Sequence, residues 1–362
     1  MSRMTQREDR PGPARWLVAG CAALAIGAAL ATVEPPAIAQ AKEMKDVVIG
    51  LSMKTRAQRR WALDEAQMQA EANKLGVKLI FQWANDSPTD QTAQFENLLS
   101  QNVDAMIIVP VDAAAAAKLV DEAHQQHVPV ISYDVDVPGA KLDFKVTRDN
   151  YRVGVVQAQA ALKFAPKGGN YALIKGDPAN NVAHALSDAY DKELGGDKDI
   201  KIVYNQFTAN WDPKAAQAAA ENVLGANSDK VNAFVTSNDG MATGVAQAIE
   251  GRNLQGKVFI SGLDAETPAL RLIAEGVQTM TVWSDLASQD KAAVDVAVAL
   301  ALGKTPDLKT VTVNDGAGPY PAYQVAVTEI NKSNLCEFVT KFAPKGWTSV
   351  KEVWPDNPNA CK

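Results

Sequence analysis

Short apolar runs alternate along the chain with longer stretches whose apolar residues recur at helical spacing. From residue 45 this pattern predicts strands at 47–51, 77–81, 105–109 and 128–132, with helices at 57–74, 92–101 and 113–126 between them. The strands are continuously apolar, which is typical of a parallel sheet covered on both faces. The first part of the chain is therefore expected to form a doubly wound α/β lobe.

The same alternation restarts near residue 170. It predicts strands at 171–174, 200–204, 231–236, 258–261 and 279–283, and helices at 182–193, 213–224, 241–251, 267–275 and 287–302. No Gly/Ser-rich linker separates the two units, so we expect short extended crossovers between them. We place these crossovers at 142–150 and 283–286, with a third crossing and a tail after residue 308.

The resulting organisation is α/β, with two doubly wound parallel-sheet lobes. We assign 42–147 plus about 286–312 to the N-terminal lobe, and 148–285 plus about 313–362 to the C-terminal lobe and tail. Residues 1–41 are assigned to neither lobe.

Residues 1–41 have the pattern of a signal peptide. Four arginines fall in the first 15 residues, an apolar run covers 17–31, and small residues then occupy Ala37, Ala39 and Ala41. The run is shorter than the roughly 20 residues of a spanning helix. Cys21 stands at its start, whereas a lipoprotein cysteine would follow it. We therefore predict export, with cleavage near Ala39–Ala41.

The charge and the cysteines narrow the function further. The chain has a net charge of −6 and the leader a net charge of +1, so the remainder has −7. It contains no basic block that would favour nucleic acid.

Only Cys336 and Cys361 remain after cleavage. In an oxidising compartment they suggest a disulfide; two unpaired buried thiols are the alternative.

Motifs of enzyme chemistry are weak. His124, His127 and His184 are the only histidines, and their spacing does not suit a zinc site. Gly303-Lys-Thr305 lacks the first glycine of a phosphate loop, and no Gly-x-Ser-x-Gly occurs. We predict no enzymatic activity, no metal and no cofactor.

Polar and aromatic residues follow the predicted strands, where ligands bind to open parallel sheets. The candidate binding residues are Arg60, Trp61, Asp134, Asn180, Trp211, Asn238 and Asp264. Carboxylates, amides and guanidinium groups pair with vicinal hydroxyls, and indole faces cover the C–H patches of a sugar ring. The sequence therefore predicts one carbohydrate site between the lobes.

Three of these residues allow a second interpretation. Trp211 directly precedes a helix, and we expect it to stack on the ligand. At the next strand end we assign Asp239 to the helix cap and Asn238 to the cleft. Asp264 could either cap the following helix or accept two hydroxyl protons, and both roles stay open from the residues alone.

Several short runs occur together in a characteristic order: Arg60-Trp61, Tyr133-Asp134, Asp149-Asn150, Val153-Gly154, Asn180-Asn181, Trp211, Ser237-Asn-Asp239, Ser261-Gly-Leu-Asp264 and Thr279-Met-Thr-Val282. In this order the chain resembles the ribose/galactose/xylose-type periplasmic binding proteins, most closely their D-xylose-binding members. The resemblance implies a type I fold with a three-segment hinge. It also implies a periplasmic location and an ABC permease with its ATPase as partners. By position, Arg60, Trp211, Asn238 and Asp264 fall on sugar contacts, with Asp134 a further one.

The chain departs from the xylose-binding members at four positions. They carry Arg, Lys, Asp and Asn where this chain has Val135, Ser284, Asn180 and Val182. The ligand is therefore left open among pentoses, hexoses, polyols and cyclitols, and we expect a monomer. The alternatives are a sugar sensor for signalling and, less favoured, a secreted enzyme using Asp134 and Asp264 as acid and base.

Overall fold

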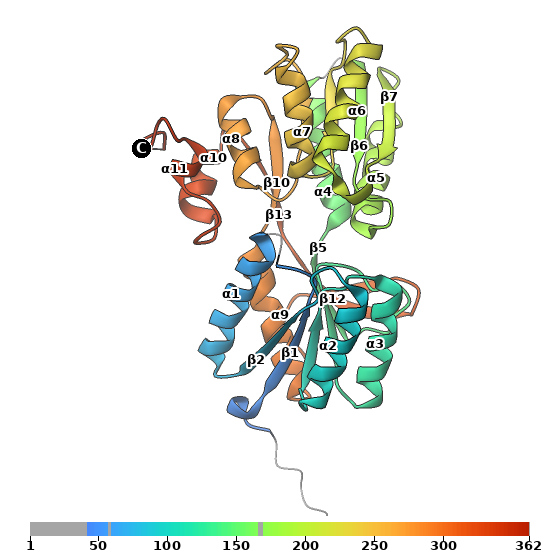
Figure 1. The fold of residues 1–362 in the computed structure, drawn as a ribbon, viewed down its shortest axis with the longest axis vertical. Coiled ribbons are helices and arrows are strands. Elements are labelled where there is room, and N and C mark those ends of the chain that lie inside the picture. Colours follow the sequence, from blue (N-terminus) through green and yellow to red (C-terminus); the bar gives the residue numbers. More distant parts are fainter. Residues whose placement is uncertain (1–41, 57–58, 166–168, 362) are drawn as a thin grey trace, which may run out of the picture. The chain divides into compact units, whose positions relative to one another are not determined.

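The first lobe is built on a seven-stranded sheet. The computed structural model describes residues 42–56, 59–165 and 169–361, so the predicted signal peptide lies outside the described residues. The strand order is β11–β12–β5–β4–β3–β1–β2, and every neighbouring pair is parallel except β11–β12 (Figure 1). After a short 3₁₀ turn, η1 (Met44–Asp46), the strands are β1 (Val48–Met53), β2 (Lys78–Trp83), β3 (Ala105–Ile108), β4 (Val130–Tyr133), β5 (Phe144–Arg148), β11 (Val311–Asn314) and β12 (Pro319–Val325).

Helices cover both faces of this sheet. On one face Ile107 of β3 packs with α1 and α9, and on the other its neighbour Ile108 packs with α2 and α3 (Figure 1). Because both faces are covered, consecutive strand positions are apolar, which explains the continuous runs in the sequence. The helices are α1 (Arg59–Leu75), α2 (Pro88–Ser100), α3 (Ala113–Gln125) and α9 (Leu286–Ala301).

The second lobe repeats the plan on a smaller scale. Its four-stranded sheet has the order β7–β6–β8–β9, all parallel, and its two faces are covered by α4 with α5 and by α6 with α7. The antiparallel pair β10–β13 lies beside this sheet, joined to it through a bridge between Leu263 and Val282. The strands are β6 (Gly169–Lys175), β7 (Ile200–Phe207), β8 (Ala233–Thr236), β9 (Phe259–Ile260), β10 (Met280–Ser284) and β13 (Val327–Asn331). The helices are α4 (Asn150–Phe164), α5 (Asn181–Leu194), α6 (Pro213–Ala226), α7 (Asp239–Glu250) and α8 (Thr267–Glu275).

The chain passes between the two sheets at three places. These are Asp149, between β5 and α4; Asp285, between β10 and α9; and Ala326, between β12 and β13. The expected fold class is thus confirmed, but the third crossing lies 14 residues beyond the expected boundary at 312. Residues 319–325 stay in the first sheet because β12 pairs in parallel with β5. The apolar pattern did not predict this strand because β12 contains two prolines and several exposed or half-exposed positions.

The last part of the second lobe is a C-terminal segment, residues 335–361. It consists of α10 (Leu335–Glu337), a π-helical turn (Phe338–Phe342) and α11 (Val350–Val353), and it packs against α8 and β10. Cys336 and Cys361 form a disulfide with a Cα–Cα distance of 5.2 Å, as the sequence suggested. Within the described ranges, none of the helices has the length and apolar character needed to cross a bilayer.

Candidate binding site

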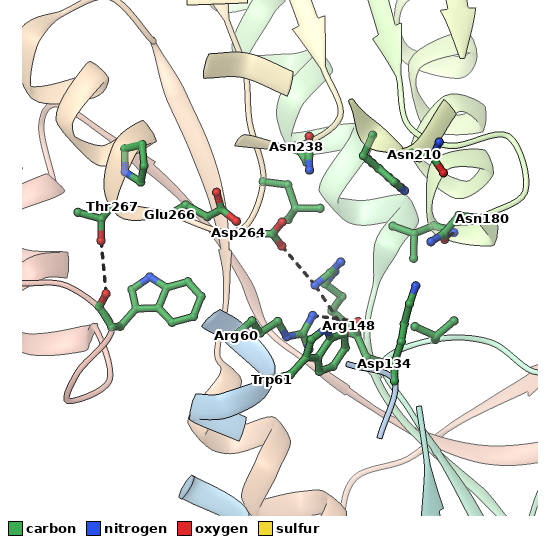
Figure 2. A pocket seen from close by; sticks show the side chains of 17 residues that line it. Arg60, Trp61, Asp134, Arg148, Asn180, Asn210, Asn238, Asp264, Glu266 and Thr267 are labelled. Atoms are coloured by element: carbon green, nitrogen blue, oxygen red, sulfur yellow. Dashed lines mark hydrogen bonds and ion pairs between the residues drawn. The ribbon is translucent and has the colours of Figure 1, made fainter. Parts of the chain in front are cut away.

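One cavity of about 520 Å³ is lined by side chains from both lobes (Figure 2). The carboxyl ends of β1, β4 and β5 contribute on the first-lobe side, and the loops after β6, β7, β8 and β9 contribute on the other. All seven residues predicted from the sequence lie on its wall: Arg60, Trp61, Asp134, Asn180, Trp211, Asn238 and Asp264. The rule that ligands bind beyond the strand ends thus located the cavity.

Arg60 dominates the first-lobe wall. Its Nη1 donates to Asp134 Oδ2 at 2.9 Å and its Nε to Asp64 Oδ2 at 3.3 Å. The guanidinium carbon lies 4.6 Å from the centroid of the Trp61 ring, a cation–π contact. Its Nη2 is buried and finds no acceptor in the described part of the chain. This wall therefore holds a fixed cation with one donor to spare.

Asp134 is an ionised acceptor in this wall. Burial alone would raise its pKa, but Arg60 and Arg148 outweigh burial and hold the pKa of Asp134 well below its usual range. Gln289 Nε2 donates to its other oxygen at 3.2 Å. The backbone at Asp134 has a φ of 65°, a conformation that non-glycine residues rarely adopt. Strain and charge pairing together point this carboxylate into the cavity.

Two further carboxyls lie behind the wall. Burial raises the pKa of Asp64 to about 6, although Arg60 pulls it down. Burial and the charge of Asp64 raise the pKa of Asp290 well above its usual range, and Asp290 accepts the Tyr133 hydroxyl at 2.5 Å. The first-lobe wall is therefore backed by a layer of buried ionisable groups that fixes Arg60 and Tyr133.

Arg148 was not among the sequence candidates, yet it stands between the two lobes. It ends β5, and its Nε donates to Asn150 at 2.9 Å. Its Nη1 lies 3.6 Å from Asp134 Oδ1 and 3.7 Å from Asp264 Oδ1, so it faces one carboxylate from each lobe (Figure 2). Ligands bind beyond the carboxyl ends of parallel strands, and this rule could have identified Arg148. From the sequence, however, 142–150 is assigned to a crossover and not to a strand.

Two amides from helix N-termini form the second-lobe wall. Asn180 Oδ1 accepts from Val182 N at 2.9 Å, and Asn238 Oδ1 accepts from Met241 N at 3.0 Å. Each side chain thus caps a helix, while its NH₂ group has no acceptor within the residues that the structure describes. Both amides present donors to the cavity.

The assignment of the cap at α7 was wrong. Asn238 is the N-cap, and Asp239 is buried, with Oδ2 accepting from Glu266 N at 2.8 Å and Oδ1 from Gln278 at 3.1 Å. Burial, Glu266 and Asp264 raise the pKa of Asp239 well above its usual range. Asn238 therefore combines the two roles that the sequence had divided between neighbours, because capping uses only its oxygen.

Trp211 lines the cavity from the short turn η2 (Ala209–Trp211) that precedes α6. Asn210 and Trp211 both have positive φ, 57° and 53°. The indole lies close to Gly176, where a Cβ would come within 2.2 Å of the ring. A side chain at position 176 would displace the indole, so this glycine sets the position of the aromatic surface.

Asp264 does not cap a helix: α8 begins after Glu266. Desolvation in the cavity raises the pKa of Asp264 despite the opposing charges of Arg148 and Arg60. Of the two roles left open by the sequence, the structure brings Asp264 to the cavity, facing Arg148 (Figure 2).

Basic and acidic side chains line the cavity in equal number. Its lining includes three cations, Lys54, Arg60 and Arg148, and three acids, Asp134, Asp264 and Glu266. Among residues 42–56, 59–165 and 169–361, no group of three or more His, Cys, Asp or Glu side chains is arranged to hold a metal ion. The site offers directed hydrogen bonds and three indole rings, those of Trp61, Trp211 and Trp347. Burial and the charge of Asp264 raise the pKa of Glu266 to about 7.

A family model for a periplasmic binding protein domain matches residues 49–305. The D-xylose-binding periplasmic protein of Escherichia coli strain K12 is 35% identical over 304 residues, covering 83% of this chain and 92% of that protein. A carbohydrate transporter solute binding protein of Chloroflexus aurantiacus, solved with D-glucose, is 27% identical with a TM-score of 0.75. The match covers 84% of this chain and 97% of that protein. The Caulobacter myo-inositol binding protein, solved with myo-inositol, is 25% identical with a TM-score of 0.67. The match covers 80% of this chain and 94% of that protein.

Proposed function

Because this chain belongs to the periplasmic binding protein domain family, we propose that it binds one neutral monosaccharide or cyclitol between its lobes. It then delivers this ligand to the permease of an ABC importer. The observation that carries the proposal is the convergence of all seven predicted residues on one cavity. These residues, together with Arg148, are the proposed ligand contacts, and the chain itself catalyses no reaction.

The chemistry of the walls supports a neutral, polyhydroxylated ligand. Asp134 and Asp264 accept hydroxyl protons, while the Arg60 guanidinium and the amides of Asn180 and Asn238 donate to hydroxyl oxygens. Trp211 supplies an aromatic surface for the C–H face of the ring. The basic and acidic side chains of the lining are equal in number, so the cavity has no block of one charge that would select a charged ligand.

Ligand binding favours closure of the lobes because only the closed form makes contacts from both sides at once. Arg60 and Asp134 grip the ligand from the first lobe, and Trp211, Asn238 and Asp264 grip it from the second. A shift from mostly open to mostly closed needs a preference of roughly 5 kcal/mol. A few hydrogen bonds to charged groups, at about 1.5–3 kcal/mol each, supply it.

Calorimetry with D-xylose, D-ribose, D-glucose, D-galactose, myo-inositol and glycerol tests the binding. We expect at least one of them to bind with a stoichiometry of one, and Asp264→Ala to weaken that binding by more than about 10-fold. Asp229→Ala is the matched control, because Asp229 pairs with Arg252 outside the cavity. Absence of binding across the panel, or equal affinity of the Asp264→Ala variant, would refute the proposal.

The transport role and the location need separate experiments. We propose that residues 1–41 direct export and that the protein works in the periplasm as a monomer. Deletion of the gene should abolish uptake of the bound sugar, and a copy with the leader should restore it where a copy starting at Lys42 does not. Loss of a signalling response with unchanged uptake would instead support a sensor.

A further inference from the structure

A strained loop presents Asp264 to the cavity. Asp264 and Ala265 have φ values of 102° and 51°, both in the left-handed half of the map that side chains other than glycine disfavour. Such a conformation persists only where surrounding contacts hold it. Asp264 N donates to Val282 O at 2.9 Å, Ala265 N to Thr281 Oγ1 at 3.2 Å, and Glu266 N to Asp239 Oδ2 at 2.8 Å. All three contacts fix N–H groups.

The carbonyl group of Ala265 in this loop accepts a hydrogen bond from the C-terminal segment. Trp347 Nε1 donates to Ala265 O at 2.7 Å, and Thr267 Oγ1 donates to Trp347 O at 3.4 Å. The Trp347 side chain is buried, and its ring meets that of Trp283 edge-on at 5.2 Å. The indole N–H of Trp347 therefore binds the loop, and packing against Trp283 fixes the position of the indole ring.

The C-terminal segment is itself anchored at several points. The Cys336–Cys361 disulfide closes it, and Arg271 of α8 donates from Nη2 to Glu352 O at 2.7 Å. Leu335 and Phe338 are buried in the cluster that also contains Ala265 and Trp347. The segment thus supports the loop, and Trp347 also lines the cavity itself, so a test must separate an effect through Asp264 from a direct contact with the ligand.

We propose that Trp347 is a positioning residue for the ligand site, acting through the Ala265 carbonyl to hold the Asp264 carboxylate where it meets the ligand. The C-terminal segment, closed by its disulfide, delivers Trp347 and so forms part of the binding apparatus. This inference rests on the proposed function for its effect on affinity. Its effect on the loop is independent of any ligand.

Trp347→Phe tests the inference because it removes the N–H and keeps an aromatic ring. For the tightest binder of D-xylose, D-glucose and myo-inositol, we expect affinity to fall about 10-fold. In an Asp264→Asn background the same substitution should change affinity less than 2-fold, since its effect passes through that carboxylate. Trp354→Phe is the matched control, a tryptophan of the same segment packed on the same cluster.

Hydrogen exchange without ligand separates the two proposals. Trp347→Phe should speed exchange of the Ala265 and Glu266 amides at least 10-fold and leave that of Leu51 in β1 unchanged. If no sugar binds, the proposed function fails, and this exchange result alone decides the positioning role. Unchanged exchange, or an affinity loss equally large in the Asp264→Asn background, would overturn it.

A second variant covers the case in which Trp347→Phe fails to fold. Cys336→Ala with Cys361→Ala keeps every hydrogen bond of the loop but opens the segment. We expect a smaller change in the same direction, about 3-fold in affinity, with faster exchange at Ala265. Wild-type affinity and exchange in this variant would contradict the support role of the segment.

Discussion

The two walls of the cavity hold their polar groups in different ways. On the first-lobe wall, side chains fix each other through charge: Arg60 joins Asp134 and Asp64, and Gln289 supports Asp134. On the second-lobe wall, Asn180 and Asn238 are fixed by the N–H groups of helices, and Asp264 by a strained loop. The first wall depends on its side chains for stability, whereas the backbone preorganises the second. Substitutions that weaken binding should therefore cost much less stability on the second wall than on the first.

The largest effect is expected for Arg60→Met. It leaves the buried Asp64 carboxylate without its cation and Asp134 with only the more distant Arg148, a loss that costs about 3–5 kcal/mol of unfolding free energy. Ligand binding should also become undetectable by calorimetry, while Arg56→Met, which removes an exposed pair with Glu65, changes stability by less than about 1 kcal/mol. Urea unfolding measures the stability of both variants. Equal stability of the two variants would remove the distinction between the walls.

Asp264→Asn should have a large effect on binding and little on stability. The raised pKa of Asp264 means that folding favours its neutral form, so a neutral amide does not destabilise the protein at pH 7. Loss of a charged acceptor should weaken ligand binding by about 10- to 100-fold. Calorimetry and thermal unfolding measure the two quantities. A fall in unfolding free energy comparable to that of Arg60→Met would show that the second wall also depends on charge.

Arg148→Met should change the pH dependence of binding. Arg148 lowers the pKa of Asp264, opposing the larger effect of burial. Since an ionised Asp264 is the better acceptor, affinity should fall as pH drops through this pKa. Without Arg148 the pKa rises, so the loss should begin at a higher pH than in the wild type. Calorimetry between pH 4 and 8 measures the midpoint, and an unshifted midpoint would contradict the coupling between the lobes through Arg148.

The smallest effects are expected for the helix caps. Asn180→Ala and Asn238→Ala should each lower the unfolding free energy by about 1 kcal/mol through loss of the cap and weaken binding several-fold. Asp112→Ala is the matched control: Asp112 caps α3 through Ala115 N at 2.7 Å but does not line the cavity. It should show the same loss of stability with unchanged affinity. An affinity loss in the Asp112→Ala variant would indicate a general effect of destabilisation.

Much of the fold could be predicted from the sequence because burial on both faces of a sheet leaves unbroken apolar runs. Helix α8 was predicted with its observed bounds, and α3 and α5 within one residue. Strand β12 was missed because its prolines and exposed positions interrupt that pattern. Arg148 was missed for a related reason, since β5 had been interpreted as a crossover.

The sequence by itself determined the fold class and which residues follow each strand, because apolar periodicity and the strand-end rule depend on short stretches of chain. Only the tertiary structure decided how those residues are held. The apolar periodicity did not predict the positive φ of Asp134, Trp211 and Asp264, because it reports burial and not backbone conformation. Trp347 lies 83 positions beyond Asp264, and only the folding of the C-terminal segment against α8 and β10 brings its indole to that loop.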